Sequence, residues 1–304
     1  MKDRYLRYIN KLNIPHNKTI IITGANSGIG FEASKYFAYL SYNIVFAIRN
    51  IEKGKIAKEE ILKEYPNTNI GILELDLSSL DSIHSFVNKV KEKKIDIDIF
   101  YANAGVYHLP LSYTKDGFEM VMGTNCIGNY VLFNELYDYL RTLNHRVKYI
   151  FTTSLTSRTV KMNYNDFFMI KKYKKMKMYA LSKLGTNQVY LYAINKCKNT
   201  NVLPLLMHPG ITYTPLIKKA YKSKVFCMCA NAFMVTIFHK VDKAALSSLY
   251  LASDNISTPT FVGPRGIYQS SGYPKIHKLY RSSYRDYQKT IEVIDELVKN
   301  KTAC

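Results

Sequence analysis

The sequence predicts an α/β fold: one doubly wound domain in which a parallel sheet of about seven strands carries helices on both faces. Apolar runs of strand length alternate with amphipathic stretches from Thr19 to about Val262. No linker or low-complexity segment interrupts this alternation. Continuous apolar strands separated by helices are typical of a parallel sheet that is buried on both faces, so one domain fits better than two.

The elements follow in a regular order along the chain. The expected strands are residues 19–23, 43–48, 70–75, 95–101, 147–153 and 202–207, with a weaker seventh strand near 266–269. The clearest helices between them are 31–40, 51–65 and 80–91. We therefore expect an N-terminal extension (1–18), a single domain (19–274) and a mostly helical, charged tail (275–304).

The composition is that of a soluble globular protein, with 47% hydrophobic and 22% charged residues. The five cysteines show no paired metal-ligand spacing, and none of the seven histidines forms a His-x-x-x-His pair, so we expect no metal site. We interpret the cysteines as reduced thiols, which favours a cytoplasmic location.

The formal net charge of +20 raises the question of a nucleic-acid partner. Its densest stretch is residues 171–177, which contains five lysines. We favour the interpretation that these lysines lie on a solvated surface, with a basic rim that attracts an anionic substrate as the alternative. Nothing in the chain resembles a nucleic-acid-binding fold, so we expect no such partner.

Two segments bear on contact with membranes. Residues 1–18 carry basic residues without a continuous apolar core, which is neither a signal peptide nor a membrane anchor. The apolar run 225–238 is shorter than the roughly 20 residues of a spanning helix. Packing in the core or a pocket is the favoured interpretation of this run, and shallow insertion at a membrane surface is the alternative.

A glycine-rich loop links the first strand to the first helix and reads Thr23-Gly24-Ala25-Asn26-Ser27-Gly28-Ile29-Gly30. Glycines at this spacing allow a tight turn, close approach of the backbone to a pyrophosphate, and close packing of the helix on the sheet. The helix N-terminus then faces the negative charge. The loop therefore predicts a dinucleotide-binding site of the Rossmann type.

The end of the second strand indicates which dinucleotide binds. It reads Ala47-Ile48-Arg49-Asn50, with no carboxylate before Glu52. An acidic residue at this point holds the ribose 2′-hydroxyl of NAD, whereas an arginine accommodates the 2′-phosphate of NADP. We expect NADP(H) to be preferred over NAD(H), with a purely surface position for Arg49 as the alternative.

Tyr179 and Lys183 form a candidate proton-transfer pair. They are four residues apart and therefore lie on one face of a helix. A free phenol has a pKa of about 10, and a neighbouring ammonium group moves that pKa toward neutrality. The chain contains 26 tyrosines, so packing is the alternative role for Tyr179 when it is considered alone.

Taken together and in this order, the motifs resemble those of the short-chain dehydrogenase/reductase family over roughly residues 19–270. The loop 23–30, the pair Asp76-Leu77, the triplet Asn103-Ala104-Gly105, and the positions of Asn125, Ser154, Tyr179 and Lys183 carry the resemblance. So does His208-Pro209-Gly210 followed by Thr214. The cofactor contacts that it implies are Gly24, Asn26, Ser27, Gly28, Ile29, Gly30, Arg49, Asp76, Leu77, Asn103, Ala104, Gly105, Tyr179, Lys183, Pro209, Gly210 and Thr214.

The resemblance also implies a reaction and four catalytic residues. Hydride passes between a nicotinamide ring and a carbonyl carbon, while Tyr179 donates the proton in reduction and accepts it in oxidation. Lys183 lowers the pKa of Tyr179 and binds the nicotinamide ribose. Ser154 donates a hydrogen bond to the carbonyl oxygen. Asn125 holds a water that connects Lys183 to solvent.

A finer resemblance is to the retinol-dehydrogenase-like branch, which includes relatives of protochlorophyllide reductase. Residues 47–50, 116–119 and 182–184 look like that branch, as does the long interval between Ser154 and Tyr179. The branch implies a hydrophobic carbonyl or alcohol substrate, such as a retinoid, a steroid or a lipid-like molecule. Reduction of a carbon–carbon double bond and a nucleotide-binding regulator without turnover are the alternatives.

Two further expectations concern the substrate and the assembly. The segment 211–240 is rich in Met and Phe, and we expect it to form a lid over a hydrophobic pocket. The sequence leaves the oligomeric state open. Helices at residues 125–140 and 178–195 are candidates for a homodimer interface, as in many relatives of the family.

Overall fold

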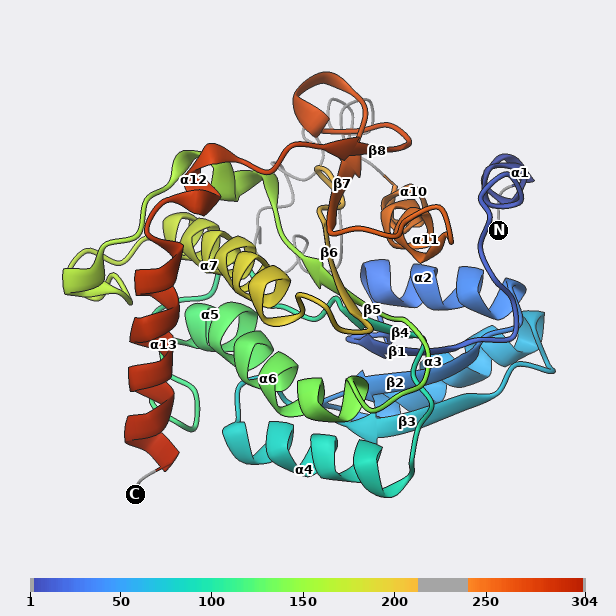
Figure 1. Ribbon diagram of the computed structural model, residues 1–304, viewed down its shortest axis with the longest axis horizontal. Coiled ribbons are helices and arrows are strands. Elements are labelled where there is room, and N and C mark those ends of the chain that lie inside the picture. The colour runs from blue at the N-terminus through green and yellow to red at the C-terminus, as the bar shows by residue number, and fades with distance from the viewer. Residues whose placement is uncertain (1–2, 213–239, 303–304) are drawn as a thin grey trace, which may run out of the picture.

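A computed structural model describes residues 3–212 and 240–302, which form one eight-stranded sheet in the order β3-β2-β1-β4-β5-β6-β7-β8 (Figure 1). Strands β1 to β7 pair in parallel, and β8 pairs antiparallel with β7 at one edge. The strands are β1 (Thr19–Thr23), β2 (Asn43–Ile48), β3 (Ile70–Glu74), β4 (Ile99–Ala102), β5 (Val147–Thr152), β6 (Val202–Met207), β7 (Thr260–Pro264) and β8 (Pro274–His277).

Helices cover both faces of the sheet, which confirms the predicted doubly wound fold (Figure 1). One face carries α2 (Gly28–Tyr39), α3 (Ile51–Glu64) and α11 (Leu246–Ala252), with α1 (Asp3–Ile9) and α10 (Val241–Ala244) beside them. The other carries α4 (Leu80–Glu92), α6 (Gly128–Leu140) and α7 (Lys175–Lys196), with α13 (Tyr287–Thr302) against α7. Shorter turns of helix are α5 (Met120–Met122), η1 (Gly123–Ile127), η2 (Leu155–Thr159), η3 (Tyr164–Asp166), η4 (Ile267–Gln269) and α12 (Arg281–Tyr284).

The strand order explains both the sequence pattern and the position of the site. β5 and β6 lie in the interior of the sheet and are buried at every position, which is why their runs are apolar apart from Lys148 and Thr152 of β5. The chain winds one way from β1 through β2 to β3 and then returns to the other side of β1 with β4. In such sheets the crevice at this switch point, beyond the carboxyl ends of the strands, is where ligands bind.

The predicted position of the seventh strand is wrong. β7 occupies Thr260–Pro264, and residues 266–269 form the turn η4 that leads into β8. Tyr268 and Gln269 have φ values of 50° and 59°, which belong to the left-handed region and cannot continue a strand. The boundary expected between residues 274 and 275 falls inside β8, so the edge strand joins the tail to the sheet.

The two ends of the described chain pack on opposite faces of the sheet. Tyr5 and Ile9 of α1 are buried in the same cluster as α2 and α11. On the other face, Ile294 of α13 is buried, and the Tyr130 hydroxyl donates a hydrogen bond of 2.6 Å to Asp295. Within residues 3–212 and 240–302, no helix has the length and apolar content needed to cross a membrane.

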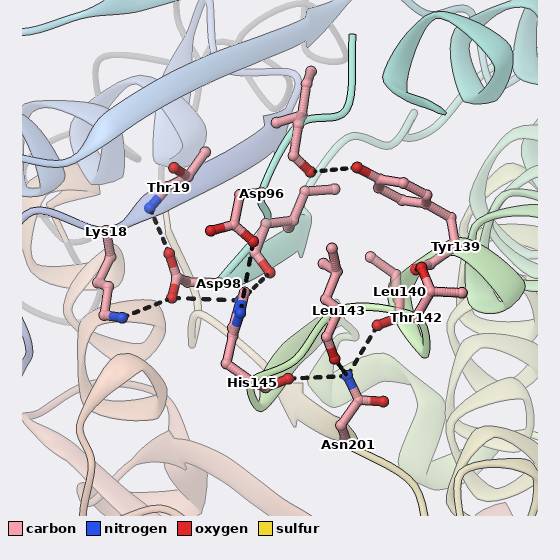
Figure 2. Close-up of polar contacts among 12 residues, drawn as sticks. Lys18, Thr19, Asp96, Asp98, Tyr139, Leu140, Thr142, Leu143, His145 and Asn201 are labelled. Carbon is pink, nitrogen blue, oxygen red and sulfur yellow. Dashed lines mark hydrogen bonds and ion pairs between the residues drawn. The ribbon is translucent and has the colours of Figure 1, made fainter. Parts of the chain in front are cut away.

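A polar cluster fastens the amino-terminal edge of the sheet (Figure 2). Asp98, which precedes β4, accepts a hydrogen bond of 2.8 Å from the Thr19 amide of β1 and pairs with Lys18 at 3.0 Å. The His145 ring lies 3.6 Å from Asp96 and 3.7 Å from Asp98. These contacts fix the starts of β1, β4 and β5 relative to one another.

Asn201 extends this cluster to β6 (Figure 2). Its Nδ2 donates to the carbonyls of Leu140, Leu143 and His145 at 3.0, 2.8 and 2.9 Å. Leu140 ends α6, and the other two carbonyls belong to the turn before β5. One side-chain amide therefore satisfies the Leu143 and His145 carbonyls of the turn and is a second donor to the Leu140 carbonyl, which also accepts from the Leu143 amide.

We predict that Asn201→Ala lowers the free energy of unfolding by about 1–3 kcal/mol, because it leaves partly buried carbonyls unsatisfied. Urea denaturation followed by circular dichroism measures the change. Asn67→Ala, on an exposed turn, is the control and should change stability by less than about 0.5 kcal/mol. Equal stability of the two variants would contradict the role of Asn201.

Candidate active site

The loop between β1 and α2 has the open geometry that a phosphate group needs. Gly24 and Gly28 have φ values of 67° and 60°, which residues with side chains rarely adopt. A side chain at Gly30 would come within 2.6 Å of Asn103 Nδ2. The Ser27 side chain makes no capping hydrogen bond to α2. The first turn of α2 therefore presents its amide groups to an anion.

Asn103 joins this loop to the end of β4. Its Nδ2 donates a hydrogen bond of 2.9 Å to the Thr23 carbonyl at the end of β1. In return, Thr23 Oγ1 accepts hydrogen bonds from the Asn103 and Ala104 amides at 2.9 and 2.8 Å. Three hydrogen bonds thus hold the carboxyl ends of the two strands that flank the switch point.

Arg49 and Asp76 meet at the carboxyl ends of the neighbouring strands β2 and β3. The guanidinium Nη1 lies 3.7 Å from Asp76 Oδ2, and the Arg49 side chain is 70% exposed. Asp76 Oδ1 accepts hydrogen bonds from the Ser78 amide at 2.9 Å and the Ser78 hydroxyl at 2.6 Å. The carboxylate is held in place, while the guanidinium remains accessible to a ligand at this edge.

The backbone after Asp76 is tightly packed. Leu77 is buried, and a side chain at Gly128 of α6 would come within 2.2 Å of the Leu77 carbonyl. Glycine at this point lets α6 approach the loop that follows β3. The Leu77 side chain itself belongs to the core, so only the backbone and the edge of this residue are placed to meet a ligand.

Ser154 follows β5 and begins η2. Its Oγ accepts hydrogen bonds from the Thr156 amide at 3.4 Å and from the Thr156 hydroxyl at 3.1 Å. The Ser154 carbonyl accepts from Ser157 Oγ at 2.7 Å. The serine is therefore both a helix cap and a hydroxyl at the carboxyl edge of the sheet. Thr156 is the donor in both contacts to Oγ, so the Ser154 proton is left for the hydrogen bond with Tyr179.

Lys183 is a buried cation on α7. Its Nζ donates a hydrogen bond of 2.8 Å to the Thr152 carbonyl, the last residue of β5. The residue is only 5% exposed, and burial lowers the pKa of its ammonium group to about 8. The ammonium nitrogen lies 5.9 Å from the centre of the Tyr179 ring. A lysine whose pKa is close to neutral pH therefore lies beside the Tyr179 phenol.

The pKa of Tyr179 is shifted in the opposite direction from the one that the sequence predicted. Burial raises the pKa of its phenol to about 12, and the hydrogen bond with Ser154 lowers it by a smaller amount. Lys183 was expected to pull this pKa toward neutrality, but its ammonium group is bonded to Thr152 and desolvation of the phenolate dominates. The ring of Tyr179 packs edge-on against Tyr107, with centroids 4.8 Å apart. The phenol is therefore kept protonated, the state required of a proton donor.

Asn125 lies in η1, a single π-turn that leads into α6. Its Oδ1 accepts a hydrogen bond of 2.7 Å from the Val106 amide. Its Nδ2 donates to the Val106 carbonyl at 2.9 Å and to Ser182 Oγ at 3.0 Å. A side chain at Gly105 would come within 2.9 Å of Asn125 Oδ1 and 3.6 Å of Lys183 Nζ. Asn125 thus joins the loop after β4 to α7 right beside the ammonium group.

The loop after β6 carries the last predicted contacts, Pro209 and Gly210. Gly210 has a φ of 78°, and a side chain there would come within 2.4 Å of the Ser270 carbonyl. The His208 ring contacts Gln269 Oε1 at 2.9 Å, and the Tyr280 hydroxyl donates to the same oxygen at 2.8 Å. Turn η4 therefore supports this loop from behind. Thr214 and most of the expected lid at 211–240 lie outside the described residues.

The described residues of the predicted site gather along one edge, at the carboxyl ends of β1 to β6. The edge offers an open helix N-terminus, glycines where a side chain would fill the groove, and a phenol, hydroxyl and ammonium group together. These residues fit a dinucleotide. A nicotinamide dinucleotide bound at this edge would supply or accept a hydride, and the phenol, hydroxyl and ammonium group are placed where a proton would be needed.

Comparisons with known proteins agree with this geometry. Residues 18–224 match the family model described as short chain dehydrogenase. The chain belongs to the short-chain dehydrogenase/reductase family. It is therefore an oxidoreductase, and the expectation drawn from the order of its motifs is confirmed.

The similar proteins also place the chain within the family. It is 32% identical to "Retinol dehydrogenase 13" of Mus musculus, over 84% of this chain and 78% of that protein. It is 28% identical to "Polyprenol dehydrogenase" of Homo sapiens, over 87% and 80% of the two chains. An uncharacterised protein of Mycobacterium paratuberculosis has the same fold, with a TM-score of 0.75, 24% identity and coverage of 96% and 97%. The retinol-dehydrogenase-like resemblance is confirmed.

Several residues that shape the site were missed by the sequence analysis. Thr23 and Gln269 act only through hydrogen bonds to other loops, and Thr156 shares the Ser154 hydroxyl. Glu119 is fully buried, yet it accepts hydrogen bonds from the Val121 and Met122 amides and from the Tyr173 hydroxyl. Thr23 could have been identified from the sequence, because it is a hydroxyl-bearing residue at the first position of the glycine-rich loop 23–30. Glu119 ends the 116–119 motif quoted above, whereas Thr156 and Gln269 belong to no motif that the sequence reveals.

Proposed function

We propose that this protein is an NADP(H)-dependent enzyme that interconverts a carbonyl group and an alcohol on a hydrophobic substrate, such as a retinoid, a steroid or a lipid-like molecule. The observation that carries the proposal is the convergence of Ser154, Tyr179 and Lys183 beside the glycine loop. The names of two similar proteins, a retinol and a polyprenol dehydrogenase, support a hydrophobic substrate.

In the proposed reduction, Ser154 donates a hydrogen bond to the substrate oxygen and holds it near Tyr179. The phenol of Tyr179 gives its proton to that oxygen as hydride reaches the carbon. Lys183 then returns a proton to Tyr179. Asn125, whose amide is fully engaged with Val106 and Ser182, fixes the geometry around Lys183. The backbone carbonyl of Asn125 already accepts hydrogen bonds from Asn129 Nδ2 at 3.0 Å and Thr186 Oγ1 at 3.2 Å, so a water of the proposed relay would have to share this acceptor.

The preference for NADP(H) rests on Arg49. Its guanidinium group is exposed at the end of β2 and pairs only loosely with Asp76, at 3.7 Å. A 2′-phosphate carries more charge than a ribose hydroxyl and would gain more from this cation. The nearest acidic residue on the chain beyond Arg49 is Glu52, which forms an ion pair with Lys55 instead.

The proposed assembly is a homodimer formed through α6 and α7, and the structure supports it less than it supports the proposed reaction. α13 of the same chain packs against α7, and Asn195 of α7 donates a hydrogen bond of 2.7 Å to the Tyr287 hydroxyl. Tyr130 of α6 is bonded to Asp295 of α13 at 2.6 Å. Part of the face that a second copy would use is therefore covered from within the chain.

We predict that Tyr179→Phe lowers kcat for NADPH-dependent reduction of retinal by about 10²–10⁴-fold, because the proton donor is lost. The dissociation constant for NADPH should stay within about twofold, since the ring still packs against Tyr107. Stopped-flow absorbance at the NADPH band measures both quantities. Tyr190→Phe on the same helix is the matched control, and equal activity of the two variants would refute the assignment.

The position of deuterium identifies the reaction. With NADPH deuterated at the transferred position, carbonyl reduction places the label on the carbon that bears the hydroxyl group. Mass spectrometry of the product measures this. A label on a former alkene carbon would support reduction of a carbon–carbon double bond instead.

We predict that reduction falls as pH rises through about 8, the pKa to which burial lowers Lys183. Below this pH the ammonium group holds the proton that Tyr179 needs, and above it that proton is lost. Lys148 is the control, because burial lowers its pKa to about 8 as well, but it lies at the amino-terminal edge of the sheet. Lys148→Met should keep the descending limb of the kcat–pH profile. A flat profile in the wild type would contradict the role of Lys183.

We predict that Arg49→Ala weakens NADPH binding by about 10- to 100-fold, the effect of losing one charged hydrogen-bond partner. NADH binding should change by less than about twofold. Fluorescence titration with each dinucleotide measures the two constants. Arg141→Ala, an exposed arginine at the other end of the sheet, should alter neither. Equal losses for NADPH and NADH would show that Arg49 does not read the 2′-phosphate.

A further inference from the structure

The turn between β7 and β8 presents two large apolar side chains to solvent. Ile267 and Tyr268, at the tip η4, are each 81% exposed, the highest values among the large hydrophobic residues of the described chain. Ile276 on β8 is 50% exposed. Exposed apolar residues are ordinary when they are scattered singly, but two adjacent ones at the apex of a hairpin are not.

The tip is held in this shape by its neighbours. Gln269 is bonded to His208 and Tyr280, and the Ser270 carbonyl accepts a hydrogen bond of 2.8 Å from the Ile211 amide. Tyr268 has a left-handed φ of 50°. The hydrogen bonds of Gln269 and Ser270 hold the end of the turn against the protein, and the left-handed backbone at Tyr268 turns the chain at the tip. Ile267 and Tyr268 therefore project away from the protein. The exposure is therefore built into the turn.

The hairpin is also strongly basic. Residues 255–285 contain no aspartate or glutamate but five cations, Arg265, Lys275, Lys278, Arg281 and Arg285, which gives this segment a formal charge of +5. All five are exposed. Arg265 lies just before the tip, and Lys275 and Lys278 lie on the returning strand and beyond it. Arg265 and Lys275 thus lie on the two arms next to the apex, and Lys278 lies farther along the returning arm.

We propose that the β7–β8 hairpin docks on an anionic lipid surface, with Ile267 and Tyr268 inserted at the interface and Arg265, Lys275 and Lys278 against lipid phosphates. An aliphatic and an aromatic side chain flanked by cations is the composition that binds such interfaces. A nucleic acid would complement the charge and leave Ile267 in water. A neutral protein surface would complement the tip and leave the cations unmatched.

The position of the hairpin gives the docking a consequence. Gln269 and Ser270 connect the tip to His208 and Ile211, which flank the Pro209-Gly210 loop of the candidate active site. Docking at Ile267 and Tyr268 would therefore bring that edge of the sheet close to the lipid. The docking is independent of the reaction proposed above, because it concerns residues outside the catalytic set.

Flotation of the full chain with vesicles tests the proposal. We expect binding to vesicles of phosphatidylcholine mixed with phosphatidylserine, weakened by salt, and much less binding to phosphatidylcholine alone. Ile267→Ser combined with Tyr268→Asn should reduce the partition coefficient by about tenfold or more, because the apolar tip is lost. Asparagine suits the left-handed backbone at residue 268. Ile56→Ser, a 65% exposed residue of α3 at the opposite edge of the sheet, is the control for the tip.

The charge is tested with a matched pair of triple variants. Replacing Arg265, Lys275 and Lys278 with glutamine should weaken binding by about fivefold for each cation removed. Replacing three exposed lysines far from the hairpin (Lys53, Lys91 and Lys93) removes the same charge from the whole protein and should have little effect. Equal loss in both triples would show that total charge alone governs binding. Equal loss in the two triple variants would overturn the proposal. So would a tip variant that binds vesicles as the wild type does, or a wild-type protein with no preference for anionic vesicles.

Binding to vesicles requires no turnover, so the assay separates this proposal from the proposed reaction. A tip variant that loses vesicle binding while reducing a water-soluble carbonyl at the wild-type rate would support the docking surface alone. A wild-type protein that binds anionic vesicles without any reductase activity would leave the docking surface standing and refute the reaction.

Discussion

The hydrogen bond from the buried Lys183 ammonium group to the Thr152 carbonyl is the interaction on which the site depends. An ammonium group removed from water is stable only with a close acceptor, and burial still lowers its pKa to about 8. The bond ties α7 to the last residue of β5. Because Tyr179 is one helical turn before Lys183, the same bond fixes the phenol beside Ser154, which follows β5.

Small residues make this arrangement possible. A side chain at Gly185 would come within 2.5 Å of Cys126 Sγ, so glycine lets α7 approach the turn η1. Asn125 in that turn then reaches Val106 and Ser182, which joins the loop after β4 to α7. Close packing on one side and hydrogen bonds on the other hold the catalytic edge rigid. The proposed reaction requires such preorganisation, because a hydroxyl and a phenol would then meet the substrate oxygen without further rearrangement.

The sequence predicted those features that local patterns encode. β1, β2 and β6 lie where their uninterrupted apolar runs placed them, and the glycine loop identified the dinucleotide edge. Features that depend on long-range contacts escaped it. Residues 266–269 had the composition of a strand, but Gln269 is bonded to His208 and Tyr280, and this holds a turn instead. Likewise, the spacing of Tyr179 and Lys183 predicted proximity correctly, whereas the pKa of the phenol is set by burial, which spacing does not reveal.

The central claim is that Lys183 is a buried cation whose proton is available near neutral pH. Its pKa can be measured directly by NMR titration of the lysine side-chain signals, with Lys183→Arg and Lys148→Met variants assigning the two buried lysines. The account predicts a transition for Lys183 near a pKa of about 8. A Lys183 signal that titrates with the exposed lysines, near their ordinary value of about 10.4, would contradict it.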